Sequence, residues 1–166
     1  MDYKDLIAEG KLKKEKAIGI DQVKRFLERA RKDLETAKSI EDDDGAALAL
    51  VYDSMFHAAN SLIRYQGYRP GIKFQHVGLI EAVKRTIGED FNELILKYDK
   101  LRIKRNKFEY QAIYNITKTQ LKNNIKDAEK FVEIIEKYLK DKDPQLSFDL
   151  QIKKMPSNPN SGVSLK

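Results

Sequence analysis

Apolar residues return every three or four positions over most of this chain, and that period limits how it can fold more than any other feature. Between Asp21 and Ser39 the apolar positions alternate between spacings of four and three, at Val23, Leu27, Ala30, Leu34 and Ala37. Such spacing places them all on one face of an α-helix. The pattern predicts an all-α fold whose helices pack through these faces.

Start and stop signals divide the rest of the chain into further helices, expected over about 3–9, 45–65, 75–87, 90–114 and 117–142. Asp42, Asp43 and Asp44 suit the N-terminus of the helix over 45–65, where the helix dipole is positive. This helix is apolar nearly all round and is therefore expected at the centre of the bundle. Thr117 and Gln120 form a capping box, and Gly88 is a stop signal. Short connections predict antiparallel neighbours, and so an up-and-down helical bundle of four to five main helices.

The 166 residues are expected to form one domain with two extensions. Residues 1–16 are predicted as a short helix and a basic linker, residues 17–143 as the bundle, and residues 144–166 as an extended C-terminal tail. In the tail, Leu146, Phe148, Leu150 and Ile152 alternate with polar residues, a period of two that is typical of a strand. Two interpretations stay open. The tail either docks on a partner, because a helical bundle has no sheet of its own, or folds back over its own helices.

The composition excludes several kinds of protein. There is no Cys, and therefore neither a disulfide framework nor a thiolate site. The first residues are charged and lack the apolar segment of a signal peptide, and polar residues interrupt the longest apolar stretch, so no membrane span is expected. These features predict a soluble, cytoplasmic protein. A net charge of +6 fits an anionic partner such as RNA, although a solvated surface rich in Lys and Glu explains it equally.

The helix over 90–114 carries the most unusual polar cluster. Arg105 stands in its inward stripe, where an apolar residue is expected. Four more polar residues border that stripe, namely Arg102, Asn106, Glu109 and Tyr110. An arginine binds a phosphate through two hydrogen-bond donors. A tyrosine adds a ring that can stack, and an asparagine adds a side chain that can form hydrogen bonds. The structural alternative is an Arg105–Glu109 pair at i, i+4, with Arg102 and Lys104 extending their charged ends to water.

A second polar set lies on one face of the helix over 45–65, at Asp53, His57, Asn60 and Arg64. A histidine on such a helix is more often a hydrogen-bonded core residue than a catalyst. Asp53 is expected to orient His57 or to pair with Arg102 or Arg105. His76 begins the next helix, where a capping role is enough to explain it. Two histidines and scattered carboxylates do not make a zinc site, and no glycine-rich phosphate loop is present, so no metal or organic cofactor is expected.

Four stretches follow one another within residues 20–140, namely Tyr52-Asp-Ser-Met-Phe-His-Ala-Ala59, Gly67-Tyr-Arg-Pro70, His76 and Arg102-x-x-Arg-Asn-x-x-x-Tyr110. In this order they resemble the HEPN family of small helical domains. The resemblance implies a helical bundle that is usually a homodimer. Many members are metal-independent endoribonucleases, often toxins encoded beside a minimal nucleotidyltransferase that acts as antitoxin. Their motif is an Arg, then a polar residue that is often Asn, and a His five residues after the Arg, with two copies facing across the dimer.

Carried over to this chain, Arg105 matches the motif Arg, Asn106 matches the polar residue, and Tyr110 stands where His is expected. The ordinary pKa of a tyrosine is about 10 and that of a histidine about 6.5. A tyrosine is therefore better suited to act as an acid or a stacking partner than as a base. The resemblance thus implies an RNA- or nucleotide-binding domain with Arg105, Asn106 and Tyr110 as catalytic candidates.

Supporting roles in that site are expected for other residues of the two helices. Arg102 and Lys104 would bind phosphate, and Asp53, His57 and Glu109 would support the site. One rival is a non-catalytic HEPN partner of a nucleotidyltransferase. The other is a plain structural bundle whose arginines build a dimer interface.

Overall fold

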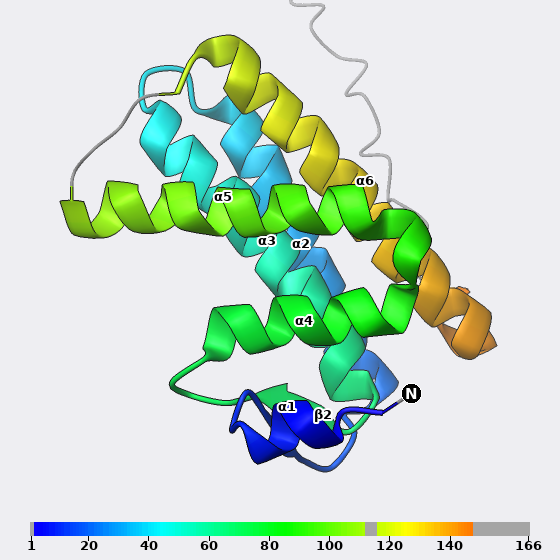
Figure 1. Ribbon diagram of the computed structural model, residues 1–166. Helices are drawn as coiled ribbons and strands as arrows, with labels where there is room; N and C mark the ends of the chain where they lie inside the picture. The colour runs from blue at the N-terminus through cyan, green and yellow to red at the C-terminus, as the bar shows by residue number, and fades with distance from the viewer. Residues whose placement is uncertain (1, 112–115, 148–166) are drawn as a thin grey trace, which may run out of the picture.

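Five long helices make up most of the protein in the computed structural model, which describes residues 2–111 and 116–147 (Figure 1). They are α2 (Ile20–Ser39), α3 (Asp44–Tyr65), α4 (Gln75–Ile87), α5 (Asn92–Gln111) and α6 (Lys118–Lys142). The short α1 (Lys4–Ala8) precedes them, and two single-turn 3-10 helices, η1 (Glu89–Phe91) and η2 (Pro144–Ser147), precede α5 and follow α6. The predicted all-α bundle is confirmed, and the long helices fall within a few residues of the bounds expected from the sequence.

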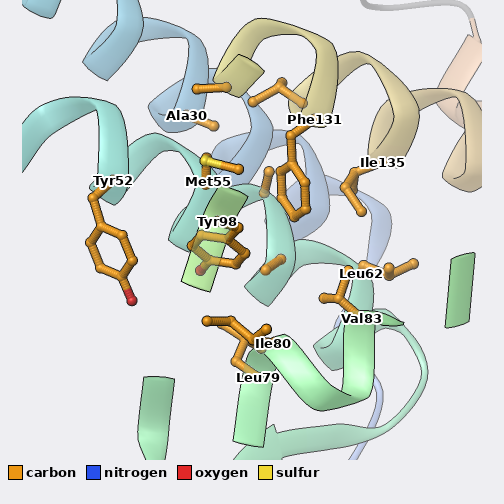
Figure 2. Close-up of a cluster of buried hydrophobic side chains, with 14 of the residues drawn as sticks. Ala30, Tyr52, Met55, Leu62, Leu79, Ile80, Val83, Tyr98, Phe131 and Ile135 are labelled. Carbon is orange, nitrogen blue, oxygen red and sulfur yellow. The ribbon is translucent and has the colours of Figure 1, made fainter. Parts of the chain in front are cut away.

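Helix α3 is the centre of the fold, as its apolar sequence predicts. It contacts α2, α4, α5 and α6. In Figure 1, α2, α3 and α6 run alongside one another, and α4 and α5 cross them. Figure 2 shows Met55 and Leu62 of α3 among side chains of the other four long helices, including Tyr98 and Phe131.

Side-chain caps fix where the helices begin. The Asp43 carboxylate accepts a hydrogen bond of 2.9 Å from the Ala46 amide at the start of α3. At α6 the Thr117 hydroxyl accepts from the Gln120 amide, and the Gln120 side chain accepts from the Thr117 amide, both at 3.2 Å. These contacts confirm the capping box and the N-terminal role of the aspartate run, because each satisfies an amide that the helix itself leaves without a partner.

A small sheet joins the segment predicted as a linker to the residues that follow α3. Strand β1 (Leu12–Lys14) pairs antiparallel with β2 (Tyr68–Pro70), with Leu12 opposite Pro70 and Lys13 opposite Arg69. Both strands are three residues long, too short to show a period of two, and they lie more than fifty residues apart, so local composition does not reveal them. Part of the expected linker is therefore a strand, and the inference that the bundle has no sheet of its own was wrong.

The N-terminal segment packs closely onto that sheet and α4. Tyr3, Leu6 and Leu12 are buried in the same core as the long helices. A side chain on Gly71 would overlap the backbone carbonyl of Gly10, so this close approach requires glycine.

The start of the predicted extended tail has another conformation. Residues 144–147 form the 3-10 turn η2, in which Leu146 is fully buried. The prediction of an extended segment that begins at Leu146 is therefore wrong for this first residue. Leu146 packs into its own domain, against α6 and α2. Residues 148–152, which carry the rest of the alternating pattern, lie outside the described residues.

Candidate functional site

The polar site forms where the second half of α5 passes the first half of α3. A side chain on Gly45 would overlap the ring of Phe108, so glycine at this position allows the two helices to approach closely. In the first half of α5, three side chains are buried against the core, namely Leu94, Tyr98 and Leu101. The same stripe then continues into Arg105, whose guanidinium is carried to the edge of that core.

Arg105 is held between two carboxylates and an aromatic ring. Its Nη1 lies 2.6 Å from Glu109 Oε2 and its Nη2 lies 4.0 Å from Asp53 Oδ1. The guanidinium carbon lies 5.5 Å from the centroid of the Tyr52 ring, within cation–π range. The side chain is 18% exposed, and its buried Nε–H has no hydrogen-bond partner among the described residues.

The electrostatics of this cluster reflect partial burial. Burial raises the pKa of Asp53, and the opposite charge of Arg105 offsets part of that rise. The expectation that Asp53 pairs with an arginine of α5 thus agrees with the geometry, while the alternative, that Asp53 orients His57, does not.

Beneath Arg105, Tyr52 of α3 joins His76 of α4. The Tyr52 hydroxyl lies 2.6 Å from His76 Nδ1. Burial raises the pKa of Tyr52 well above its usual range, so the phenol keeps its proton in this contact. Burial and the nearby charges of Arg105 and Arg102 lower the pKa of His76, so its imidazole is neutral at pH 7. The role of His76 is therefore this contact and not the cap that its position suggests.

Other predicted site residues of α5 stay apart from Arg105. Arg102 donates from Nε to Asp99 at 2.7 Å and lines a groove of 360 Å³ between α4 and α5. Lys104 is exposed, Asn106 is half-buried, and Tyr110 is 80% exposed. Among the described residues, none of these three has a hydrogen bond or ion pair with Arg105. A single chain therefore assembles Arg105, Glu109 and Asp53, and leaves Tyr110 turned outward.

His57 belongs to a different site. Its Nδ1 lies 3.0 Å from the buried carboxylate of Asp33 on α2, which also accepts from Arg29 Nε at 2.9 Å. Asp33 was not among the residues predicted for the site. An acidic residue beside the apolar stripe of α2 is the signal that could have pointed to it, since a carboxylate at such a position needs a partner.

In the described ranges, no group of three or more His, Asp and Glu side chains is arranged to hold a metal ion. None of the helices described there has the length and apolar content needed to cross a membrane.

Comparison with protein families agrees with this architecture. The family model of the HEPN domain matches residues 23–138, more than half of the chain. The chain belongs to the HEPN family. The match covers α2 to most of α6, so the HEPN domain includes Arg105, Tyr52 and His76, while α1, β1 and η2 lie beyond it. At the level of the family, this supports a function that concerns nucleotides or RNA. A search of the curated proteins found no match.

Proposed function

We propose that this HEPN domain binds RNA through the second half of α5 and cleaves it without a metal ion, in a toxin–antitoxin or defence setting. The observation that carries the proposal is the placement of Arg105. Its guanidinium is fixed over the Tyr52 ring at the edge of the core, and its Nε–H has no partner among the described residues. A guanidinium ordered in this way is suited to a phosphate, because its planar fork donates two parallel hydrogen bonds.

Each candidate residue has a distinct role in this proposal. Arg105 holds the phosphate and stabilises the charge that builds on it during attack by the 2′-hydroxyl. Arg102 and Lys104 add positive charge along α5, and Asn106 positions the phosphate. The 2′-hydroxyl loses its proton to water as its oxygen bonds to phosphorus and the bond to the 5′-oxygen breaks. Tyr110 protonates the leaving 5′-oxygen and recovers a proton from water, or it stacks on a base while water supplies that proton.

Glu109 and Asp53 restrain Arg105 until the phosphate arrives. Their carboxylates are the groups with which a phosphate must compete for the guanidinium.

We further propose that two copies pair through α5, which brings the two Tyr110 side chains together. Leu96, Ile103 and Tyr110 are exposed apolar or aromatic residues spaced seven apart, so they share one face of α5. Leu96 is 60% exposed and Ile103 is 42% exposed. A second copy of the same face would remove these side chains from water. Ile113, an apolar residue beyond Tyr110, lies outside the described residues.

The test is an RNA cleavage assay in EDTA with the full chain. Wild type should cleave and leave a 2′,3′-cyclic phosphate, whereas Arg105→Ala should lose cleavage because the phosphate loses its charge partner. Arg25→Ala on α2 removes the same charge from an exposed site and serves as the control. Tyr110→Phe keeps the ring and loses the hydroxyl, so it separates proton donation from stacking. Full activity in Arg105→Ala would reject the site.

The rival function is a non-catalytic partner of a minimal nucleotidyltransferase. The pairing of Arg105 with Glu109 favours it, because that ion pair also explains Arg105 as a structural residue. Binding of RNA without cleavage by wild type, or a stable complex with a nucleotidyltransferase encoded in the neighbouring reading frame, would favour this rival.

A further inference from the structure

A further pocket lies beside Phe56 of α3. It has a volume of 310 Å³, and its walls include Phe26, Phe56, His57, Asn60, Arg64 and Arg69. None of these residues belongs to the Arg105 cluster, although the Phe56 ring lies 5.1 Å from the His76 ring. The volume is at the lower end of the range for small-molecule sites, about 300–1,000 Å³, so it suits one compact ligand.

His57 gives this pocket a fixed polar group. The buried Asp33 carboxylate can only accept hydrogen bonds, so the hydrogen between the two residues lies on His57 Nδ1. In the neutral ring, Nε2 is then the acceptor. The His57 side chain is 28% exposed, and Arg29 holds Asp33 from its other oxygen. The arrangement orients the imidazole before any ligand binds.

Two arginines give the pocket positive charge. Arg64 donates from Nε to Asn60 Oδ1 at 3.3 Å and from Nη1 to Glu15 Oε2 at 3.0 Å, and these two bonds fix its guanidinium. Among the described residues, Nη2 has no such partner and can donate to a ligand. The backbone of Arg69 is fixed by its pairing with Lys13 in the small sheet. No acidic side chain of residues 2–111 and 116–147 lies within ion-pair distance of Arg69. Its charge is thus available to an anion.

Aromatic rings complete the pocket. The centroid of the His57 ring lies 6.4 Å from that of Phe26 and 6.0 Å from that of Phe56. Both phenylalanines are half-buried, and the Arg64 guanidinium carbon lies 6.0 Å from the Phe26 centroid. Half-buried rings beside guanidinium groups are the combination on which nucleobases stack.

From this combination we infer that the pocket binds a nucleotide with a terminal phosphate monoester. The phosphate lies on Arg69 and Arg64, the base stacks on Phe26 or Phe56, and His57 Nε2 accepts a hydrogen bond from the sugar or base. The site is separate from the proposed RNA site and does not require cleavage at Arg105. A free mononucleotide and the 5′-phosphorylated end of an RNA strand offer the same chemistry.

The test is calorimetric titration of the full chain with AMP, with inorganic phosphate, and with a short RNA carrying either a 5′-phosphate or a 5′-hydroxyl. AMP should bind, and more tightly than inorganic phosphate. Tighter binding of the 5′-phosphorylated RNA than of its 5′-hydroxyl form would identify a strand end as a ligand, and AMP binding alone a free nucleotide. Equal affinity for AMP and phosphate, or no binding of AMP, would overturn the inference.

Variants locate the site. Arg69→Ala should weaken AMP binding about tenfold or more, because a charge-assisted contact is lost. Lys122→Ala removes an exposed charge from α6, which lines no part of this pocket, and should leave the affinity unchanged. Phe26→Leu keeps an apolar side chain, removes the ring and should also weaken binding. If Arg105→Ala loses AMP binding and Arg69→Ala does not, the nucleotide binds at the other site and the inference is wrong.

Discussion

At the residue scale, Arg105 is an arginine whose charge is already neutralised within its own chain. The carboxylates of Glu109 and Asp53 lie 2.6 and 4.0 Å from its guanidinium. Either this pairing is the whole purpose of the residue, or it holds the guanidinium in place until a phosphate replaces the carboxylates. The two interpretations differ in what happens when Glu109 loses its charge.

We expect Glu109→Gln to tighten RNA binding, because the phosphate no longer competes with a carboxylate for Arg105. Any loss of negative charge helps a polyanion to bind, so the control is Glu93→Gln at the other end of α5, where Glu93 pairs with exposed Lys97. The measurement is RNA affinity at matched salt. Equal gains in the two variants would assign Arg105 to structure alone.

His76 is expected to make folding depend on pH. Burial and the charges of Arg105 and Arg102 lower its pKa, while Glu109 acts in the opposite direction. The unfolded chain therefore binds a proton at His76 at higher pH than the folded protein does, so the free energy of unfolding falls as pH drops below the ordinary value of 6.5 and through the lowered pKa.

The measurement is urea unfolding of wild type and His76→Gln at about pH 7.5 and about pH 5.5, on either side of the ordinary histidine value. Wild type should lose more stability than the variant on acidification. Parallel losses would show that other groups set the dependence.

At the scale of elements, α3 should contribute unequally along its length. Ile63 is fully buried, and Ile63→Ala should lower the free energy of unfolding by about 2–5 kcal/mol through lost burial and the cavity that remains. Leu50 is only partly buried, so Leu50→Ala should cost less. Chemical denaturation of both variants checks the ranking, which a larger loss in Leu50→Ala would contradict.

An ion pair joins α2 to α6 beside their apolar contacts. Arg31 donates from Nε and Nη2 to the two oxygens of buried Glu136, at 2.6 and 2.5 Å. We expect Glu136→Gln to cost about 1–3 kcal/mol, because one donor of the arginine is left without its charged acceptor. Glu129→Gln is the matched control on α6, since the pair of Glu129 with Lys38 is largely exposed and should contribute about 0–1 kcal/mol. Equal effects in denaturant unfolding would contradict this view.

At the scale of the whole molecule, the proposed dimer makes α5 the shared element. Ile103→Lys places a charge in the middle of the face formed by Leu96, Ile103 and Tyr110, and it should convert the dimer to a monomer. Ile72→Lys changes an equally apolar residue that is 81% exposed in the loop before α4, and it should leave assembly unchanged. Sedimentation velocity measures both. A wild-type mass of one chain would remove the dimer and the composite site.

The sequence alone was sufficient for the helices, their caps and their family. The stripe of α2, the capping box at Thr117 and the stop at Gly88 depend on residues three or four positions apart, whose geometry is set as soon as a helix forms. The prominence of Arg105 was visible for the same reason, because it interrupts a regular stripe.

Only the tertiary structure decided which distant side chains meet. Asp33 with His57, Tyr52 with His76 and the strand pair of Leu12 with Pro70 join segments that lie 24, 24 and 58 positions apart. Leu146 shows the same limit, since its alternating neighbours predict a strand but its own burial in the core places it in a 3-10 turn. Local patterns fix the period of a helix or strand, whereas the partner of each polar group depends on how whole helices pack.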